Sequence, residues 1–415
     1  MKRGRPGLGR DARLLIAGQG VRAAGYGFTA VLLGALLAAR GYTSLQAGVV
    51  LTALIAGTAL ASLAVGAFAD RIGRRLCYAV FFAGVAVAGL VVAAGAPLWA
   101  LLVVAITGTL STDVVDNGPA TTLEQAMLAA EDAGTARVFG RYNMVGAAAG
   151  ALGALAVTLP GLGRGGRVGP DGWLFAVLVP VGLAGVLFAW RLSPAVEARS
   201  AGASAPGRLA GARARLEESR TVVRRLAGLF AVDAGGSGLV TTGFLSYYFA
   251  ERYHASVADL GWLFFAVSVV QAVSVAVAPL IARRFGLVAT MVGTHLPSNV
   301  LLASVAFAPT FIVAAGLLLA RTTLSQMDVP TRQALVMAAV PPEERTPAAA
   351  VTNAARYTVR PLGPLLAGAL QQVALGTPLI VAGAVKAGYD IALWRWARRL
   401  PLGSERGVKA HARRG

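Results

Sequence analysis

The chain has 415 residues, of which 56% are hydrophobic and only 14% are charged, and its net charge is +19. Apolar runs of about twenty residues, long enough to span a bilayer as helices, recur along the whole chain. This composition predicts an all-α polytopic membrane protein. It argues against a nucleic-acid-binding protein, because the basic residues gather at both termini and in alternate loops, where they orient membrane proteins. The single cysteine, Cys77, excludes an intramolecular disulfide and a multi-cysteine metal site.

The first thirteen residues are basic, like the start of a signal peptide, but the apolar stretch that follows has no convincing cleavage site. We therefore expect this stretch to remain as the first of twelve membrane spans. An even number of spans, with most loop arginines on the side of the termini, predicts cytoplasmic termini and a location in the inner (plasma) membrane. The predicted spans are 13–39, 44–69, 75–95, 98–129, 137–159, 172–190, 226–250, 256–282, 286–307, 310–338, 347–373 and 376–397.

One linker interrupts this series. Residues 191–225 carry eight arginines and three glutamates. Their second half is either a basic helix on the anionic inner leaflet or part of a flexible tether. In both cases the linker separates an N-terminal six-helix bundle (1–190) from a C-terminal six-helix bundle (226–397). A basic tail (398–415) follows the second bundle.

The two bundles show weak internal repetition. A shift of 208 residues places Glu124-Gln125-Ala126 over Arg332-Gln333-Ala334, and a shift of 213 places Arg71-Ile72-Gly73 over Arg284-Phe285-Gly286. These matches are short, but they fall in order at nearly constant offset. They predict two parallel six-helix repeats.

The loop between the second and third spans reads Gly66-Ala-Phe-Ala-Asp-Arg-Ile-Gly-Arg-Arg75. Its glycines permit a tight turn, and its carboxylate, at a helix end, can pair with neighbouring arginines or a helix N-terminus. This loop resembles the signature loop of the major facilitator superfamily. The resemblance implies two six-helix bundles around a central cavity that opens alternately to each side of the membrane. The matching residues, which we expect to act in gating, are Gly66, Asp70, Arg71, Gly73, Arg74 and Arg75.

Ionisable groups within apolar spans are costly, so each is a functional candidate. The resemblance implies that the first, fourth, seventh and tenth spans line the cavity. The repeat offsets place Asp113 over Arg321 and Arg22 over Asp233, so that at each equivalent pair one half has an acid and the other a base. We predict charge pairs across the pseudo-twofold axis, in which a partly desolvated carboxylate takes up a proton; static structural pairs are the alternative. The candidates are Arg22, Asp113, Asp116, Asp233, Arg321 and Asp328.

Other polar side chains complete the predicted cavity. The candidates for substrate contact are Gln19, Tyr26, Tyr247, Arg356 and Arg360. On the last span, Lys386 and Asp390 are four residues apart, so we expect them to pair with each other as a structural element. His295 is expected to be a packed polar residue.

The leading functional prediction is a monomeric secondary transporter that exports a small drug-like or amphipathic compound in exchange for protons. A uniporter or symporter of an organic anion or metabolite is the alternative, and a non-transporting receptor or scaffold is a minor one. The fourth span carries aspartates in place of the arginine usual in drug/proton antiporters, and the fifth lacks their Gly-Pro motif, so no subfamily is assigned. The sequence contains no phosphate-binding Gly-x-x-x-x-Gly-Lys-[Ser/Thr] loop and no metal-binding histidine cluster, and we expect neither enzymatic activity nor a cofactor.

Overall fold

The computed structural model describes residues 8–112, 118–128, 135–161, 169–197 and 216–398. Asp113, Asp116, the middle of the predicted linker and nearly all of the basic tail lie outside these residues. The chain divides into two compact units, Met1–Pro206 with Thr241–Ser268, and Gly207–Val240 with Val269–Gly415.

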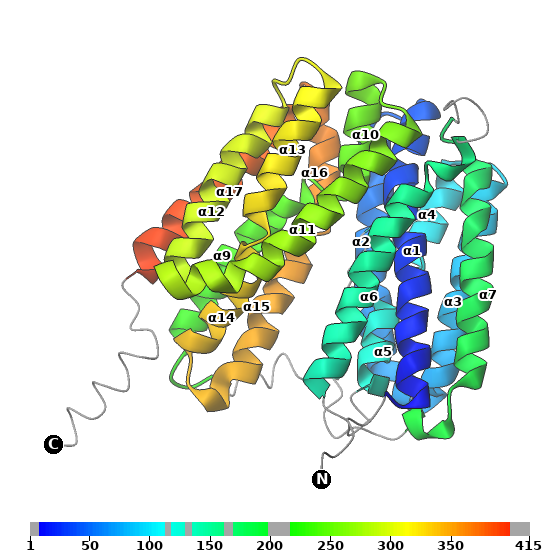
Figure 1. Cartoon of the computed structure of the whole chain (residues 1–415), viewed down its shortest axis with the longest axis horizontal. Coiled ribbons are helices and arrows are strands. Elements are labelled where there is room, and N and C mark those ends of the chain that lie inside the picture. Colours follow the sequence, from blue (N-terminus) through cyan, green and yellow to red (C-terminus); the bar gives the residue numbers. More distant parts are fainter. Residues whose placement is uncertain (1–7, 113–117, 129–134, 162–168, 198–215, 399–415) are drawn as a thin grey trace, which may run out of the picture. The chain divides into compact units, whose positions relative to one another are not determined.

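The first unit is built around one long helix. α1 (Arg10–Ala39) packs against α6, α7 and α10, and most of its residues are buried (Figure 1). The other helices of this unit are α2 (Ser44–Ile72), α3 (Arg74–Ala93), α4 (Leu98–Ile106), α5 (Pro119–Leu128), α6 (Thr135–Ala156), η1 (Leu159–Gly161), η2 (Gly172–Val177), α7 (Leu178–Arg191), η3 (Pro194–Glu197), α10 (Thr242–Tyr253) and the first part of α11 (Val257–Phe285).

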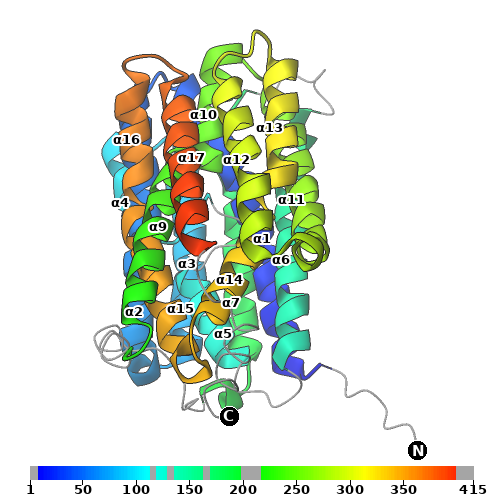
Figure 2. The same ribbon diagram turned by 90° about the vertical axis from the view of Figure 1, so that its left-hand side faces the viewer.

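The second unit has its core where α9 (Arg220–Gly238) packs against α15 and α17, and where α12 packs against α17 (Figure 2). Phe230, Met291, Leu335 and Leu393 are among the buried side chains that join these helices. The other helices are the rest of α11, α12 (Leu287–Val305), α13 (Phe311–Ser325), α14 (Asp328–Ala339), η4 (Pro342–Glu344), α15 (Arg345–Val359), α16 (Leu362–Gln371) and α17 (Thr377–Ala397).

Four of the twelve predicted spans differ from single continuous helices. The spans predicted at 98–129, 226–250, 310–338 and 347–373 correspond to the helix pairs α4 and α5, α9 and α10, α13 and α14, and α15 and α16. Local chemistry explains two of the breaks. Gly108 after α4 has a positive φ of 71°, and Pro361 after α15 has no backbone N–H to continue the helix. Six helices of the described chain are long and apolar enough to cross a membrane individually.

The repeat is visible in the turns that join α2 to α3 and α11 to α12. Gly73 and Gly286, which the sequence offset places over each other, have φ values of +109° and +85°. L-residues with a side chain rarely adopt this conformation, so both turns depend on glycine. Large apolar side chains such as Leu63, Val80 and Leu280 are more than half exposed on the outer faces of the helices, as expected for surfaces in contact with lipid.

Candidate functional site

The signature loop is fixed by contacts of its charged residues. Asp70 Oδ1 lies 2.8 Å from Arg74 Nε, and Arg74 is only 1% exposed. Glu197, at the end of η3, accepts the backbone N–H groups of Arg74 at 2.7 Å and Arg75 at 2.9 Å. A carboxylate at a helix N-terminus satisfies free N–H groups and is stabilised by the helix dipole. The start of α3 is therefore held to the segment that follows α7, while Arg71 is exposed.

A buried ion pair lies at the centre of the first unit. Arg22 of α1 and Glu124 of α5 approach to 2.9 Å, with exposures of 1% and 0%. Tyr78 of α3 and Tyr142 of α6 each donate a hydrogen bond to the same carboxylate. Arg22 also donates to Thr121 at 2.9 Å and to Gln19. The pair thus joins four helices and has the multiple hydrogen bonds that a buried charge requires.

The remaining candidates of the first unit are buried. Tyr26 lies with its ring centroid 5.4 Å from the Arg22 guanidinium and donates to the Thr109 carbonyl at 3.1 Å. Tyr247 of α10 donates to the Tyr42 carbonyl at 2.9 Å. Sequence reasoning gave Glu124 little weight because it falls near a predicted helix end.

α10 packs closely on α1. A Cβ atom at Gly34 would lie 2.2 Å from the Gly243 carbonyl oxygen, so the two backbones approach as near as glycine allows. Ser246 donates a hydrogen bond to the Val31 carbonyl from the same face. The absence of a side chain at Gly34 and the adjacent hydrogen bond fix α10 against α1 in this conformation.

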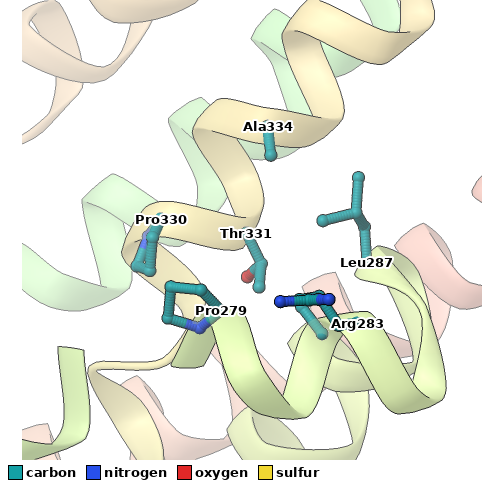
Figure 3. A pocket seen from close by; sticks show the side chains of 7 residues that line it. Pro279, Arg283, Leu287, Pro330, Thr331 and Ala334 are labelled. Atoms are coloured by element: carbon teal, nitrogen blue, oxygen red, sulfur yellow. The ribbon is translucent and has the colours of Figure 1, made fainter. Parts of the chain in front are cut away.

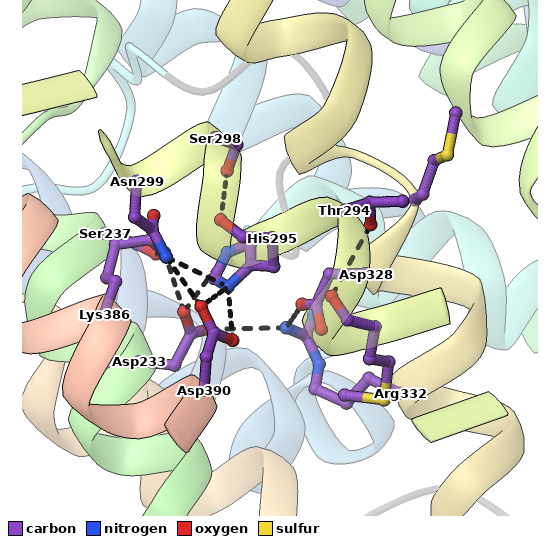
Figure 4. A network of polar contacts seen from close by, with 12 residues as sticks. Asp233, Ser237, Thr294, His295, Ser298, Asn299, Asp328, Arg332, Lys386 and Asp390 are labelled. Atoms are coloured by element: carbon purple, nitrogen blue, oxygen red, sulfur yellow. Dashed lines mark hydrogen bonds and ion pairs between the residues drawn. The ribbon is translucent and has the colours of Figure 1, made fainter. Parts of the chain in front are cut away.

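The second unit contains a larger buried network, drawn in Figure 4 and called here the Asp233 cluster: Asp233, His295, Asp328, Arg332, Lys386 and Asp390. Asp233 of α9 is at its centre. Its Oδ1 lies 2.6 Å from Lys386 Nζ, and its Oδ2 lies 3.4 Å from Arg332 Nη1. Arg332 also contacts Asp328, one turn earlier on α14. Each of these charges is at least nine-tenths shielded from solvent.

His295 of α12 connects two carboxylates of the cluster. Its Nδ1 lies 2.9 Å from Asp390 Oδ1, and its Nε2 lies 3.9 Å from Asp233 Oδ1 (Figure 4). Asn299, one turn further along α12, donates to Asp390 at 2.8 Å. The sequence-based view of His295 as only a packed polar residue is incomplete, since the ring is part of the charged network.

The predicted pair between Lys386 and Asp390 is wrong. Lys386 extends to α9, where it contacts Asp233 and donates to Ser237 at 2.7 Å, whereas Asp390 bonds to His295 and Asn299 of α12. Both residues lie on α17 and are buried, so each satisfies its charge through partners on other helices. Tertiary packing offers stronger partners here than the neighbouring turn of the same helix.

Two further arginines lie beside the Asp233 cluster. Arg321 of α13 and Arg356 of α15 are both partly buried and within electrostatic reach of Asp233. The Nε atoms of both are buried, and neither has a hydrogen-bond partner among the described residues. Arg360 follows α15 one turn later and is also partly buried.

The two networks are related by the repeat. The offsets found in the sequence place Arg22 over Asp233 and Glu124 over Arg332, and the structure pairs Arg22 with Glu124 and Asp233 with Arg332. The two ion pairs are equivalent, with the charges exchanged. We predicted charge pairs across the pseudo-twofold axis, but the ion pairs that the structure describes join residues of one unit.

A shallow pocket of about 270 Å³ lies between α11, α12 and α14 of the second unit (Figure 3). Its walls are mostly apolar, with the Arg283 guanidinium at one side. It is separate from the residues of the Asp233 cluster and contains none of the residues expected to act in transport.

This architecture of twelve spans in two repeats, each with a buried ion pair, defines a polytopic membrane protein of the transporter class. The family model of the Major Facilitator Superfamily matches residues 15–364, and the chain belongs to this superfamily. The predicted fold is thereby confirmed. A relative from Saccharomyces cerevisiae, the uncharacterized membrane protein YJR124C, is 27% identical over 393 residues, which cover 87% of this chain and 88% of the relative.

Solved structures with the same fold include three transporters. The nucleoside transporter NupG has a TM-score of 0.73 at 15% identity, with 93% of this chain and 98% of that chain covered. A D-xylose-proton symporter has a TM-score of 0.64 at 16% identity, with 93% and 97% covered. The human organic anion transporter MFSD10 has a TM-score of 0.61 at 19% identity, with 93% and 100% covered. At these identities the likeness shows the fold.

Proposed function

We propose that this protein is a proton-coupled secondary transporter that works by alternating access and exports a small organic compound. The observation that carries the proposal is the position of His295 between Asp233 and Asp390 in a buried charged network. Ionisable groups buried within membrane-spanning helices are typical of ion or proton pathways. The xylose-proton symporter supports the proposal as a structural neighbour that uses protons.

The geometry of His295 suggests how a proton is held. A neutral imidazole donates through one nitrogen only, whereas the protonated ring donates through both. Nδ1 is already within 2.9 Å of Asp390, and Nε2 faces Asp233 at 3.9 Å. Lys386 and Arg332 already contact Asp233. Proton uptake at His295 would give Asp233 a third cationic neighbour, on the same oxygen as Lys386, and weaken its dependence on Lys386.

The ionisable groups around the imidazole come from several helices. Asp233 lies on α9, Asp328 and Arg332 on α14, and Lys386 and Asp390 on α17, where the ring of Tyr389 packs against the imidazole. Arg321 of α13 and Arg356 of α15 interact electrostatically with Asp233. A proton added to this set changes the pairing of several helices together. We therefore place the coupling step in the second unit and regard the Arg22 to Glu124 pair as structural.

The conformational step in this proposal uses the break between α9 and α10. Asp233 lies on α9, one and a half turns before the break, and α10 packs on α1 through Gly34 and Gly243. Rearrangement of Asp233 and Lys386 would move α9 and thereby alter the packing of α10. We further propose that the transporter acts as a monomer in the plasma membrane, with both termini in the cytoplasm.

The test uses purified protein in vesicles that contain a pH-sensitive dye. Tetraphenylphosphonium and benzoate are added in turn to wild type, to Asp233→Asn and to Asp171→Asn, an exposed aspartate as control. Substrate-dependent proton movement that Asp233→Asn abolishes and Asp171→Asn retains would support coupling at Asp233. Substrate flux without proton movement, or proton movement unchanged in Asp233→Asn, would refute it. Vesicles with opposite protein orientation then distinguish export from import.

A further inference from the structure

Among the residues that the structure describes, the charges around Asp233 do not balance. The cations that interact with it are Arg321, Arg332, Arg356 and Lys386, and the carboxylates of the same group are Asp233, Asp328 and Asp390. Four permanent cations against three carboxylates leave one positive charge, and a protonated His295 would leave two. Charges away from bulk water are normally paired, because an uncompensated charge there is strongly destabilising.

The positive charge that no described carboxylate balances belongs to Arg321 and Arg356. Arg332 and Lys386 are both in direct ion pairs, at 3.4 Å and 2.6 Å from Asp233. In contrast, the structure describes no hydrogen bond for the Nε atom of Arg321 or of Arg356. The two guanidinium groups therefore keep hydrogen-bonding capacity that the described protein does not use.

The segment of α15 around Arg356 carries exposed polar side chains. Asn353, Tyr357 and Thr358 are exposed on this helix, although it belongs to a predicted membrane span. Exposed amide and hydroxyl groups are unfavourable against lipid tails, so we expect this part of α15 to border an aqueous space. Arg356 is thus next to exposed polar side chains, and both Arg356 and Arg321 of α13 interact electrostatically with Asp233.

We propose that Arg321 and Arg356 bind the anionic group, a carboxylate or a phosphate, of the transported compound. This inference rests on the proposed transport function and specifies its substrate class as organic anions. Guanidinium groups suit this task because their planar donors match carboxylate and phosphate oxygens in pairs. The bound anion balances the excess charge of the cluster.

The arrangement also links the substrate to the proton. Arg321 and Arg356 are attracted both to Asp233 and to the substrate anion. An anion bound at the two arginines weakens their interaction with Asp233, and a proton at His295 adds a further cation beside the same carboxylate. Binding of the anion and binding of the proton are therefore linked through electrostatics.

The experiment measures binding without transport. Purified protein in an uncharged detergent, which removes anionic lipid as a ligand, is titrated with compounds matched in shape but not in charge: benzoate against benzamide, and phenyl phosphate against phenol. Thermal unfolding followed by tryptophan fluorescence reports binding as a rise in Tm. The variants are Arg321→Gln and Arg356→Gln, with Arg284→Gln, an exposed arginine of the same unit, as control.

In wild type and Arg284→Gln, the anions should raise Tm and the neutral partners should not. In Arg321→Gln and Arg356→Gln, the apparent Kd for the anion should rise at least about tenfold, the value of one lost hydrogen bond between charged groups. Arg321→Lys and Arg356→Lys keep the charge, so they should bind the anion more tightly than the glutamine variants at the same positions. This recovery would show that a substitution at either position is compatible with folding. Equal effects of neutral and anionic compounds, no response to any anion, or unchanged anion binding in both glutamine variants would overturn the proposal. Because no gradient is used, failure of proton coupling leaves this result unaffected.

Discussion

Arg22 and Glu124 form a buried salt bridge of 2.9 Å that has a charge-reversed counterpart, Asp233 with Arg332, in the second unit. In the first unit, tyrosine hydroxyls complete the bonding of the single carboxylate. In the second, further ionisable groups take that place. The same position in the repeat is thus completed by tyrosine hydroxyls in one unit and by charged side chains in the other. This difference is why we propose a structural role for the first network and a coupling role for the second.

The first prediction concerns the stability of the first unit. Glu124→Gln leaves Arg22 buried without its counter-charge, and we expect a loss of about 3–5 kcal/mol in the free energy of unfolding. Thermal unfolding in detergent should show a clear fall in Tm. Asp171→Asn is the control: it also removes the charge of a carboxylate in the first unit, but Asp171 is exposed, so its effect should be small. Equal Tm values for the two variants would contradict a structural role for the pair.

The second prediction concerns His295. His295→Asn removes the ring that lies between two carboxylates, so substrate-driven proton movement in vesicles should be lost. His254→Asn makes the same substitution at an exposed histidine, where a φ of 51° suits asparagine, and should behave as wild type. Proton movement that persists in His295→Asn would remove the imidazole from the coupling step and leave the carboxylates as the remaining proton carriers.

The third prediction concerns the packing of α10 on α1. Gly34→Ala introduces a Cβ atom 2.2 Å from the Gly243 carbonyl oxygen, so the helices must separate. A cysteine in place of Ser246, in a Cys77→Ser background, should then react faster with a water-soluble maleimide.

Gly293→Ala serves as the control for this experiment, because a Cβ atom there meets nothing within 4 Å. It should leave the labelling rate at Ser246→Cys unchanged. Equal rates in the Gly34→Ala and Gly293→Ala proteins would show that the close approach of α10 to α1 does not limit access to this position.

The fourth prediction concerns Glu344, in the loop before α15. Burial tends to raise the pKa of this carboxyl, but hydrogen bonds from the backbone N–H groups of Glu217, Glu218 and Ser219 outweigh it and hold the pKa below its ordinary value of 4.5. Because the folded pKa is lowered, the stabilising contribution is complete above pH 4.5 and is lost as the pH falls through the folded pKa.

Glu344→Gln should therefore weaken the attachment of the segment before α9 by about 1–2 kcal/mol at neutral pH, as loss of hydrogen bonds to a charged group does. The measurement is amide hydrogen exchange of Glu217, Glu218 and Ser219, repeated at acid pH, where wild type and variant should converge. Glu343→Gln, at an exposed neighbouring glutamate, is the control. A difference between wild type and Glu344→Gln that is the same at both pH values would contradict ionic capping.

Much of the architecture was predictable from local sequence. Apolar runs of bilayer length indicated the spans, and the loop ending in Gly73-Arg74-Arg75 indicated the superfamily, which the match over residues 15–364 confirms. The breaks within four spans were missed because hydropathy averages over a helix; at two of them it does not register Gly108 with its positive φ or Pro361. Glu124 was not among the candidates because it falls near a predicted helix end, although its offset relation to Arg332 pointed to it.

The sequence by itself determined that this chain is a twelve-span facilitator-type protein in two repeats, because hydrophobic length and turn chemistry are local properties of the chain. Only the tertiary structure decided which buried charges meet. Arg22 pairs with Glu124, about a hundred residues away in the sequence. Lys386 and Asp390 lie four residues apart on one helix, but Lys386 pairs with Asp233 on α9 and Asp390 with His295 on α12. Away from water, a buried charge pairs with whichever group the packing of the helices brings within hydrogen-bond distance. The spacing of residues along one helix does not predict that partner.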